Sequence, residues 1–227
     1  MSAPRCIHSQ SPLIYWASRR FGRFVWFCCA DAQILHPERL DYPGGYLLAC
    51  NHFHHLDPFI LSTLYRRPID WLTRIEFYKY QWSTWLLDRL GSIPVNRRGV
   101  PVRAIRMAIA RVNQGRIVGI FPEGGVVAPE KSVCIGEPIK QGVCLISCRT
   151  GLPIIPVVML GTEHLSRVRP WLPFHHGQLW IAIGEPIFPP KDIASRKIAR
   201  RSIATELHRQ LGALYLELRS RFADNDL

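Results

Sequence analysis

Residues 45–58 read GYLLACNHFHHLDP, in which an apolar run is followed at once by a dense group of ionisable side chains. The run from Gly45 to Cys50 is typical of a buried strand. Three histidines and one aspartate come directly after it. In α/β proteins, functional residues gather at the carboxyl ends of strands. The stretch therefore predicts both a strand and a functional site where that strand ends.

His52 and Asp57 are the two residues of this stretch that we assign to catalysis. In a regular helix their side chains would point about 140° apart, so they can meet only across a turn between strand and helix. If they meet, the carboxylate holds one imidazole nitrogen and leaves the other free to take a proton, an arrangement worth about 10²- to 10⁴-fold in rate. Asp57 followed by Pro58 is also typical of a helix N-cap, and the two roles are compatible. We assign no catalytic role to His54 or His55.

The rest of the chain alternates short apolar runs with helix-like segments, which is the pattern of an α/β protein. We expect a single α/β domain with a mixed or mostly parallel sheet flanked by helices. The expected strands are 45–50, 69–74, 116–121, 154–160 and 179–183, and the expected helices between them are 58–66, 76–90, 102–113 and 142–150.

The two ends of the chain are predicted to differ from this central part. Residues 1–35 form an amphipathic N-terminal segment and residues 36–227 the main domain. Between 13 and 30, apolar residues recur near helical spacing beside arginines and tryptophans, so this helix is either a membrane-interface anchor or packed on the domain. No run reaches the roughly 20 apolar residues of a membrane-spanning helix. Residues 194–222 predict a long basic helix whose apolar stripe consists of Ile203, Leu207, Leu211, Leu214, Leu218 and Phe222.

The overall charge narrows the choice of partner. The chain has 29 lysines and arginines and 17 acidic residues, for a formal net charge of +12. Such a charge attracts nucleic acid, anionic lipid headgroups or phosphorylated ligands. Because no nucleic-acid-binding motif occurs, we predict no nucleic-acid partner and expect an anionic membrane surface instead. The seven cysteines have no paired Cys-x-x-Cys spacing, which favours reduced thiols over a zinc or redox site.

Four ordered blocks of sequence resemble the glycerolipid acyltransferase family, which includes the lysophosphatidic acid acyltransferases. The blocks are Asn51-His52 with Asp57, then Gly91-Ser92-Ile93-Pro94-Val95-Asn96-Arg97, then Phe121-Pro122-Glu123-Gly124, and last Pro153-Ile154-Ile155-Pro156-Val157. The resemblance covers roughly residues 40–190. It implies that the histidine is the general base and that the aspartate orients it. It also implies that Arg97 and the Phe-Pro-Glu-Gly block bind the phosphate and glycerol region of the acceptor.

The chemistry of the residues agrees with this assignment in part. The planar guanidinium of Arg97 can bind a phosphate at two points. Glu123 offers an acidic acceptor for a hydroxyl, and Gly124 offers backbone that permits close approach. Lys140 falls where relatives often have a Lys-x-Gly pair, and is a further phosphate candidate. Many relatives, however, have Thr-Arg-Ser where this chain has Gly125-Val126-Val127, which removes a cation and two hydroxyls and leaves the identity of the acceptor open.

The predicted function is transfer of a fatty acyl chain to a hydroxyl of a lysophospholipid, with 1-acylglycerol 3-phosphate as the acceptor, in phospholipid biosynthesis. The donor is a thioester, either acyl-CoA or acyl carrier protein. No Gly-x-Ser-x-Gly elbow is present and no cysteine has a nucleophile context, so the acceptor is expected to attack the thioester directly. We expect no cofactor and no metal. The expected location is the cytoplasmic face of a membrane, as a peripheral or monotopic protein.

Three alternatives remain open. The acceptor could be another lysolipid. A metal-dependent hydrolase would use the histidine-rich loop at 52–57, although the order of its residues departs from the His-x-His-x-Asp-His pattern of metallo-β-lactamase-like enzymes. The later His164, His175 and His176 have no matching motif context. A catalytically silent lipid-binding protein would keep the basic ends of the chain and need neither catalytic residue.

Overall fold

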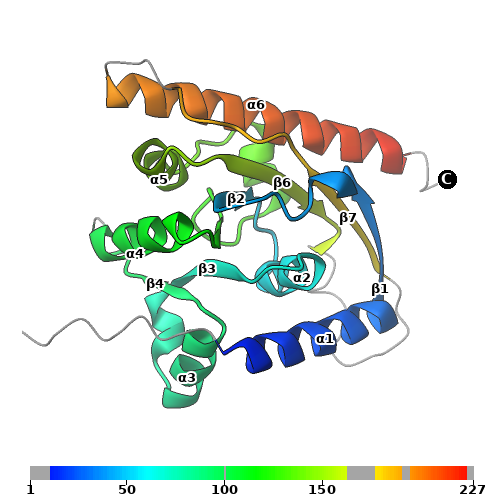
Figure 1. Cartoon of the computed structure of the whole chain (residues 1–227). Helices are drawn as coiled ribbons and strands as arrows, with labels where there is room; N and C mark the ends of the chain where they lie inside the picture. Colours follow the sequence, from blue (N-terminus) through cyan, green and yellow to red (C-terminus); the bar gives the residue numbers. More distant parts are fainter. Residues whose placement is uncertain (1–10, 100, 163–176, 191–194, 224–227) are drawn as a thin grey trace, which may run out of the picture.

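The computed structural model describes residues 11–99, 101–162, 177–190 and 195–223. Within them, seven strands form one mixed sheet with the order β1-β7-β6-β2-β5-β3-β4 (Figure 1). Every neighbouring pair is parallel except β6 and β7, which are antiparallel. The strands are β1 Ala30–Leu35, β2 Tyr46–Cys50, β3 Ile69–Arg74, β4 Ile93–Val95, β5 Ile117–Ile120, β6 Ile154–Leu160 and β7 Gly177–Ile183.

Helices cover both faces of the sheet (Figure 1). The α-helices are α1 Pro12–Cys29, α2 Asp57–Leu64, α3 Gln81–Arg89, α4 Val102–Asn113, α5 Gly142–Thr150 and α6 Arg196–Ala223. Short 3₁₀ helices, named η1 to η4 in chain order, span Pro37–Arg39, Ile75–Tyr78, Pro129–Lys131 and Val133–Ile135. Side chains of α4, α5 and α6 pack into the hydrophobic core on one face of the sheet, whereas α2 packs into the core on the other. The predicted α/β class and the mostly parallel sheet are therefore confirmed.

The apolar stripe predicted for the C-terminal helix is buried where the structure describes its side chains. Ile203, Leu207, Leu211, Leu214 and Leu218 are all buried in the core. They recur every three or four residues, so they lie on one side of α6 and dock it on the sheet. The sixth predicted member, Phe222, lies outside the described side chains. Basic residues such as Arg196 and Lys197 are exposed, which leaves a cationic outer face on this helix.

Two strands, β1 and β4, were not predicted from the sequence, and both lie at the edges of the sheet. β1 at one edge has the sequence ADAQIL with three exposed residues in the middle, and β4 at the other has three residues only. Neither shows the long apolar run of a buried strand. β1 lies within the predicted N-terminal segment 1–35 and pairs with β7. The predicted helix 76–90 is also interrupted, since Tyr80 has extended backbone between η2 and α3.

Helix α1 packs on α2 with one side, and most of its large apolar side chains that the structure describes are exposed. Gly22 faces Thr63 so closely that a Cβ would lie 2.8 Å from the threonine methyl, so the glycine permits this close approach. The Tyr15 hydroxyl accepts a hydrogen bond from the backbone N–H of Ile69. In contrast, Phe21 and Phe24 are exposed. Among the described residues, no helix is long and apolar enough to span a membrane.

Candidate active site

The carboxyl ends of the parallel strands β2, β5 and β4 lie along one edge of the sheet, and the predicted site residues follow them directly. His52 follows β2, Glu123 follows β5, and Arg97 follows β4. Parallel strands bring these ends together although up to 71 residues separate His52 from Glu123 in sequence. The fold therefore gathers most of the predicted site.

His52 and Asp57 meet across the turn between β2 and α2. Nδ1 of His52 lies 2.9 Å from Oδ2 of Asp57, and the carboxylate is fully buried. Because an ionised carboxylate can only accept, Nδ1 donates this hydrogen bond, which leaves Nε2 as the basic nitrogen. No hydrogen bond to Nε2 is found within the described part of the chain. The geometry matches a general base that is oriented by a carboxylate.

The Asp57 carboxylate organises the loop that carries His52. Its Oδ2 also accepts hydrogen bonds from the backbone N–H groups of Phe53, at 2.8 Å, and His54, at 2.9 Å. The prediction that Asp57 is the N-cap of the next helix is wrong, since α2 begins at Asp57 and Leu56 takes the cap position without a side-chain hydrogen bond. The aspartate points back toward the loop because both loop N–H groups and the imidazole offer it donors there.

The His52 ring is held in an aromatic stack. It lies nearly parallel to the Phe121 ring at a centroid distance of 3.9 Å, and Phe121 lies on the Trp71 ring at 4.7 Å. The indole has room because Gly119 faces it without a side chain, and its Nε1–H donates to Oγ of Ser62 at 2.9 Å. Stacked rings restrict the rotation of the imidazole, so its position is fixed from β3 and β5 as well as from Asp57.

Asn51 ties the same loop to strand β6. This buried side chain accepts a hydrogen bond from the backbone N–H of Met159 and donates one to its carbonyl oxygen, both at 2.8 Å. A primary amide has both an acceptor oxygen and a donor nitrogen, so it can pair with both main-chain groups of one residue, whereas an ionised carboxylate has no donor. The residue before the base is therefore a structural anchor.

Glu123 makes hydrogen bonds to the protein with both of its carboxylate oxygens. Its Oε2 accepts a hydrogen bond from the backbone N–H of His52 at 2.6 Å, and its Oε1 accepts from Oγ of Ser132 at 2.7 Å and from the N–H of Val133 at 3.3 Å. Burial raises the pKa of this carboxyl although these hydrogen bonds oppose the shift. Because both oxygens have protein partners, Glu123 connects the His52 loop to the segment at 132–133.

Arg97 and Lys140 converge on the glycine turn beside Glu123. A Cβ on Gly125 would lie 3.3 Å from Nη1 of Arg97, and a Cβ on Gly124 would collide with the Lys140 ammonium group. Gly124 also has a φ of 76°, a conformation that favours glycine. Partial burial and the nearby Arg74 lower the pKa of the Arg97 guanidinium, which stays cationic at neutral pH. Two cations thus lie over a turn that has no side chains of its own.

We expect Glu123→Gln to lower the free energy of unfolding by about 1–3 kcal/mol, because one amide nitrogen must replace a carboxylate oxygen that now accepts a hydrogen bond. Urea denaturation measures this change. Ser132→Ala is the matched control, since it removes one donor and leaves the Glu123 bond to His52 intact. Unchanged stability with lost turnover would instead place Glu123 in contact with the substrate.

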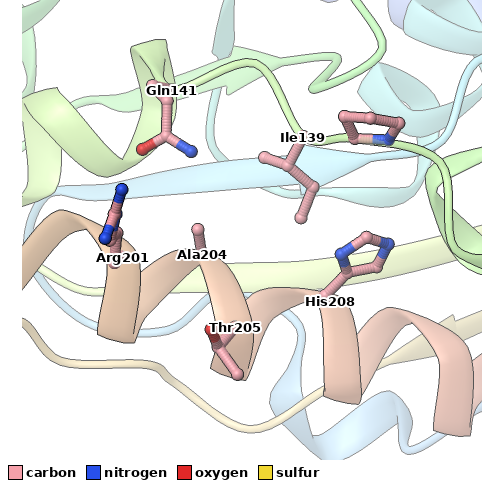
Figure 2. Close-up of a pocket in the computed structure, with 7 residues that line it drawn as sticks. Ile139, Gln141, Arg201, Ala204, Thr205 and His208 are labelled. Carbon is pink, nitrogen blue, oxygen red and sulfur yellow. The ribbon is translucent and has the colours of Figure 1, made fainter.

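Two other features do not add to this site. An open hollow of about 430 Å³ lies between α6 and the segment at 138–141, where Arg201 and His208 face Ile139 and Gln141 (Figure 2). None of the predicted site residues lines it. Among the described residues, no group of three histidine, cysteine or carboxylate side chains is arranged to hold a metal ion. His164, His175 and His176 lie outside the described residues.

The family model for acyltransferases matches residues 32–160, more than half of the chain. This chain belongs to the acyltransferase family. The match includes the strands β2, β5 and β4 and the residues His52, Asp57, Arg97 and Glu123. The chain is thus an acyltransferase, and its His52 and Asp57 lie within the residues that the family model matches.

Individual relatives agree with this assignment. The 1-acyl-sn-glycerol-3-phosphate acyltransferase of Bacillus subtilis is 24% identical over 68% of this chain and 73% of its own length. The lyso-ornithine lipid O-acyltransferase of Pseudomonas aeruginosa is 25% identical over 69% of this chain and 64% of its own length. Two further relatives are longer, and the chain spans only 57% and 60% of their length.

A solved structure shows the same fold. The crystal structure of the 1-acyl-sn-glycerophosphate acyltransferase PlsC from Thermotoga maritima superposes with a TM-score of 0.67. The two sequences are 23% identical, and the match covers 88% of this chain and 79% of the other. The mostly parallel sheet and its flanking helices are therefore an architecture that this acyltransferase shares.

Proposed function

We propose that this acyltransferase moves a fatty acyl chain from a thioester to the free hydroxyl of a lysophospholipid, with 1-acylglycerol 3-phosphate as the acceptor, in phospholipid biosynthesis. The observation that carries the proposal is the His52–Asp57 pair at 2.9 Å with two cations, Arg97 and Lys140, beside the Gly124–Gly125 turn. A base and an anion-binding group at the same end of one sheet suit an acceptor that bears both a hydroxyl and a phosphate.

The reaction follows from these positions. Nε2 of His52 takes the proton of the acceptor hydroxyl while the hydroxyl oxygen attacks the thioester carbonyl carbon. Asp57 stabilises the imidazolium that forms. The tetrahedral intermediate then collapses, the carbon–sulfur bond breaks, and the imidazolium returns its proton to the departing thiolate. The products are the acylated lipid and a free thiol, and no acyl-enzyme, cofactor or metal takes part. The thiol belongs to coenzyme A or to acyl carrier protein.

A second acceptor is favoured by one observation. Gly125 and the exposed Val126 stand where many relatives have a threonine and an arginine. The cations found beside this turn among the described residues are therefore Arg97 and Lys140. A lysolipid whose headgroup carries less negative charge than a phosphomonoester is compatible with that arrangement. The lyso-ornithine lipid that the Pseudomonas aeruginosa relative is named for is one such acceptor. A panel of lysolipids offered with acyl-CoA or acyl carrier protein, read by mass spectrometry, tests both acceptors and donors.

We place the enzyme at the cytoplasmic face of a membrane as a peripheral or monotopic protein. Exposed apolar residues on α1, including Trp16, Phe21 and Phe24, support contact with lipid. Cys50, Cys134, Cys144 and Cys148 are free thiols, which agrees with a reducing compartment. Contact with a membrane also suits an acceptor that itself resides in lipid.

We expect Arg97→Lys to reduce kcat/KM for a phosphate-bearing lysolipid by roughly 10-fold or more, because an ammonium cannot make the paired hydrogen bonds of a guanidinium. Parallel assays with a lysolipid that lacks a phosphomonoester measure the contrast. Arg98→Lys is the matched control, since Arg98 is the next residue and is equally classed as exposed, whereas the side chain that faces Gly125 is Arg97. Equal losses on both acceptors would remove Arg97 as the group that recognises phosphate.

A further inference from the structure

The surface beside the active-site loop carries exposed aromatic side chains that the proposed chemistry does not use. Phe77 in η2, Tyr80 after it, and Trp82 and Trp85 in α3 are all at least half exposed, and Trp82 reaches 68%. We call these four residues the α3 aromatic surface. Large apolar side chains that are gathered on a protein surface often mark an interaction site.

This surface lies next to the catalytic loop. The Phe77 ring meets the His55 ring edge-on at a centroid distance of 6.5 Å, and His55 in turn meets the His52 ring edge-on at 6.4 Å. The Tyr80 and Trp82 rings are stacked on each other at 6.4 Å. Whatever binds the α3 aromatic surface therefore lies near the loop that carries the proposed base.

The same end of the molecule also presents the exposed side of α1. The backbone N–H of Ser11, just before α1, donates to the carbonyl oxygen of Arg89 at the end of α3. Figure 1 shows α1 and α3 together at the end opposite α6. Leu13 and Trp16, in the first turns of α1, are 78% and 56% exposed. Two sets of exposed apolar side chains thus adjoin at one end of the molecule.

The positive charges on α1 indicate that this end of the molecule binds an anionic partner. The helix has three arginines and no acidic residue. Trp16 and these three arginines, Arg19, Arg20 and Arg23, line a hollow of about 310 Å³, and the Arg20 guanidinium lies over the Trp16 ring at 4.9 Å. Such a hollow fits the phosphate of a lipid headgroup better than an apolar protein segment.

The cations near α3 are arranged in a similar way. Lys79 lies over the Tyr80 ring at 5.5 Å, and Arg89 lies over the Trp85 ring at 5.2 Å. An aromatic ring with a cation beside it suits the boundary of a bilayer, where the ring enters the acyl region and the cation stays among headgroups. The segment of η2 and α3 also contains Glu76 and Asp88, so its net charge is small and α1 contributes most of the positive charge.

We propose that the α3 aromatic surface is a second membrane-binding surface, which enters an anionic bilayer beside α1 and holds the His52 loop at the level of the lipid headgroups. The choice of a bilayer as the occupant rests on the proposed lysolipid acceptor as well as on the charge of α1. A lipid acceptor then reaches the base without leaving the membrane.

The test is sedimentation with vesicles of phosphatidylcholine mixed with phosphatidylglycerol. The double substitution Trp82→Ala with Trp85→Ala is expected to lower the partition coefficient by at least about tenfold, because both rings leave the bilayer. Its residual binding should be more sensitive to salt than that of the parent, since the α1 arginines remain. The matched control is Ile198→Ala with Leu216→Ala on α6, two residues that are also exposed, and it should bind like the parent.

A second measurement guards against loss of folding. Trp82→Phe with Trp85→Phe keeps the apolar contact, so it should bind vesicles nearly as the parent does. It should lose the part of the fluorescence quenching by brominated lipids that comes from Trp82 and Trp85, while Trp16 on α1 remains quenched. Point substitutions are preferable to deletion of residues 1–30, because α1 packs on α2 through Gly22. Unchanged partition of the alanine double variant, or a dimer in the parent that this variant dissociates without effect on vesicle binding, would overturn the proposal.

The proposed function and the membrane surface fail separately. If the parent acylates no lysolipid but needs Trp82 and Trp85 for vesicle binding, the acceptor assignment is wrong and the surface stands. If the parent is active and the alanine double variant binds vesicles fully, the surface is wrong and the function stands. The surface predicts in addition that this variant keeps its turnover on a short-chain, water-soluble lysolipid and loses it on an acceptor embedded in vesicles.

Discussion

His52→Ala is expected to lower kcat by about 10²- to 10⁴-fold while the protein stays folded, because the substitution removes the general base and leaves the acceptor hydroxyl to lose its proton to water. Turnover is measured with a thioester donor and a lysolipid acceptor, and folding by cooperative urea denaturation. His55→Ala is the matched control, since His55 is an exposed histidine of the same loop. A folded His52→Ala variant with near-parent activity would refute the role of this histidine.

Asp57→Asn should lower kcat by roughly 10²- to 10⁴-fold as well, because a neutral amide cannot stabilise the imidazolium that forms on His52. The amide oxygen can still accept from the backbone N–H groups of Phe53 and His54, as Oδ2 does now. The loop should therefore survive. Asp57→Ala leaves those donors without a partner and should cost about 1–3 kcal/mol for each unsatisfied group.

The comparison of these two variants separates catalysis from structure. Both should be nearly inactive, but the free energy of unfolding should fall much further in Asp57→Ala than in Asp57→Asn. An Asp57→Asn protein that keeps full activity would leave this carboxylate with only the loop-organising role that its two backbone hydrogen bonds already show.

The central strands and helices could be predicted from the sequence because their patterns are strong and local. β6 has seven consecutive buried residues, and α4 has the bounds that its periodic apolar residues predict, Val102–Asn113. Edge strands lack such a signal: β1 exposes half of its residues, and β4 is three residues long. Their place in the sheet depends on pairing with distant strands, which no local pattern reports.

The part of the site that depends on residue type could be predicted from the sequence. The part that depends on the direction in which a side chain points could not. A histidine and an aspartate at the end of a strand predicted a pair, and the structure brings them together. The Asp-Pro pair predicted an N-cap, but the loop offered the carboxylate better donors. The sequence likewise shows that Glu123 is acidic and not that both its oxygens face protein N–H and O–H groups.

Asn51 and Ser132 were missed for the same reason. The amide of Asn51 bonds to Met159, which is 108 residues away, and Ser132 bonds to Glu123 from a short 3₁₀ segment. One signal was available for Asn51. A polar residue that directly follows five buried ones and precedes a catalytic candidate has to satisfy its amide inside the protein.

Because Trp71, Phe121 and His52 are stacked, the position of the catalytic imidazole depends on the register between β3 and β5. Trp71 on β3 is paired with Gly119 on β5, and Phe121 lies two residues beyond that glycine. A shift of one residue between these strands would turn Trp71 to the opposite face of the sheet and remove the support beneath the imidazole. Sequence changes far from the substrate that loosen β3 against β5 would then be selected against for their effect on turnover before any loss of folding was felt.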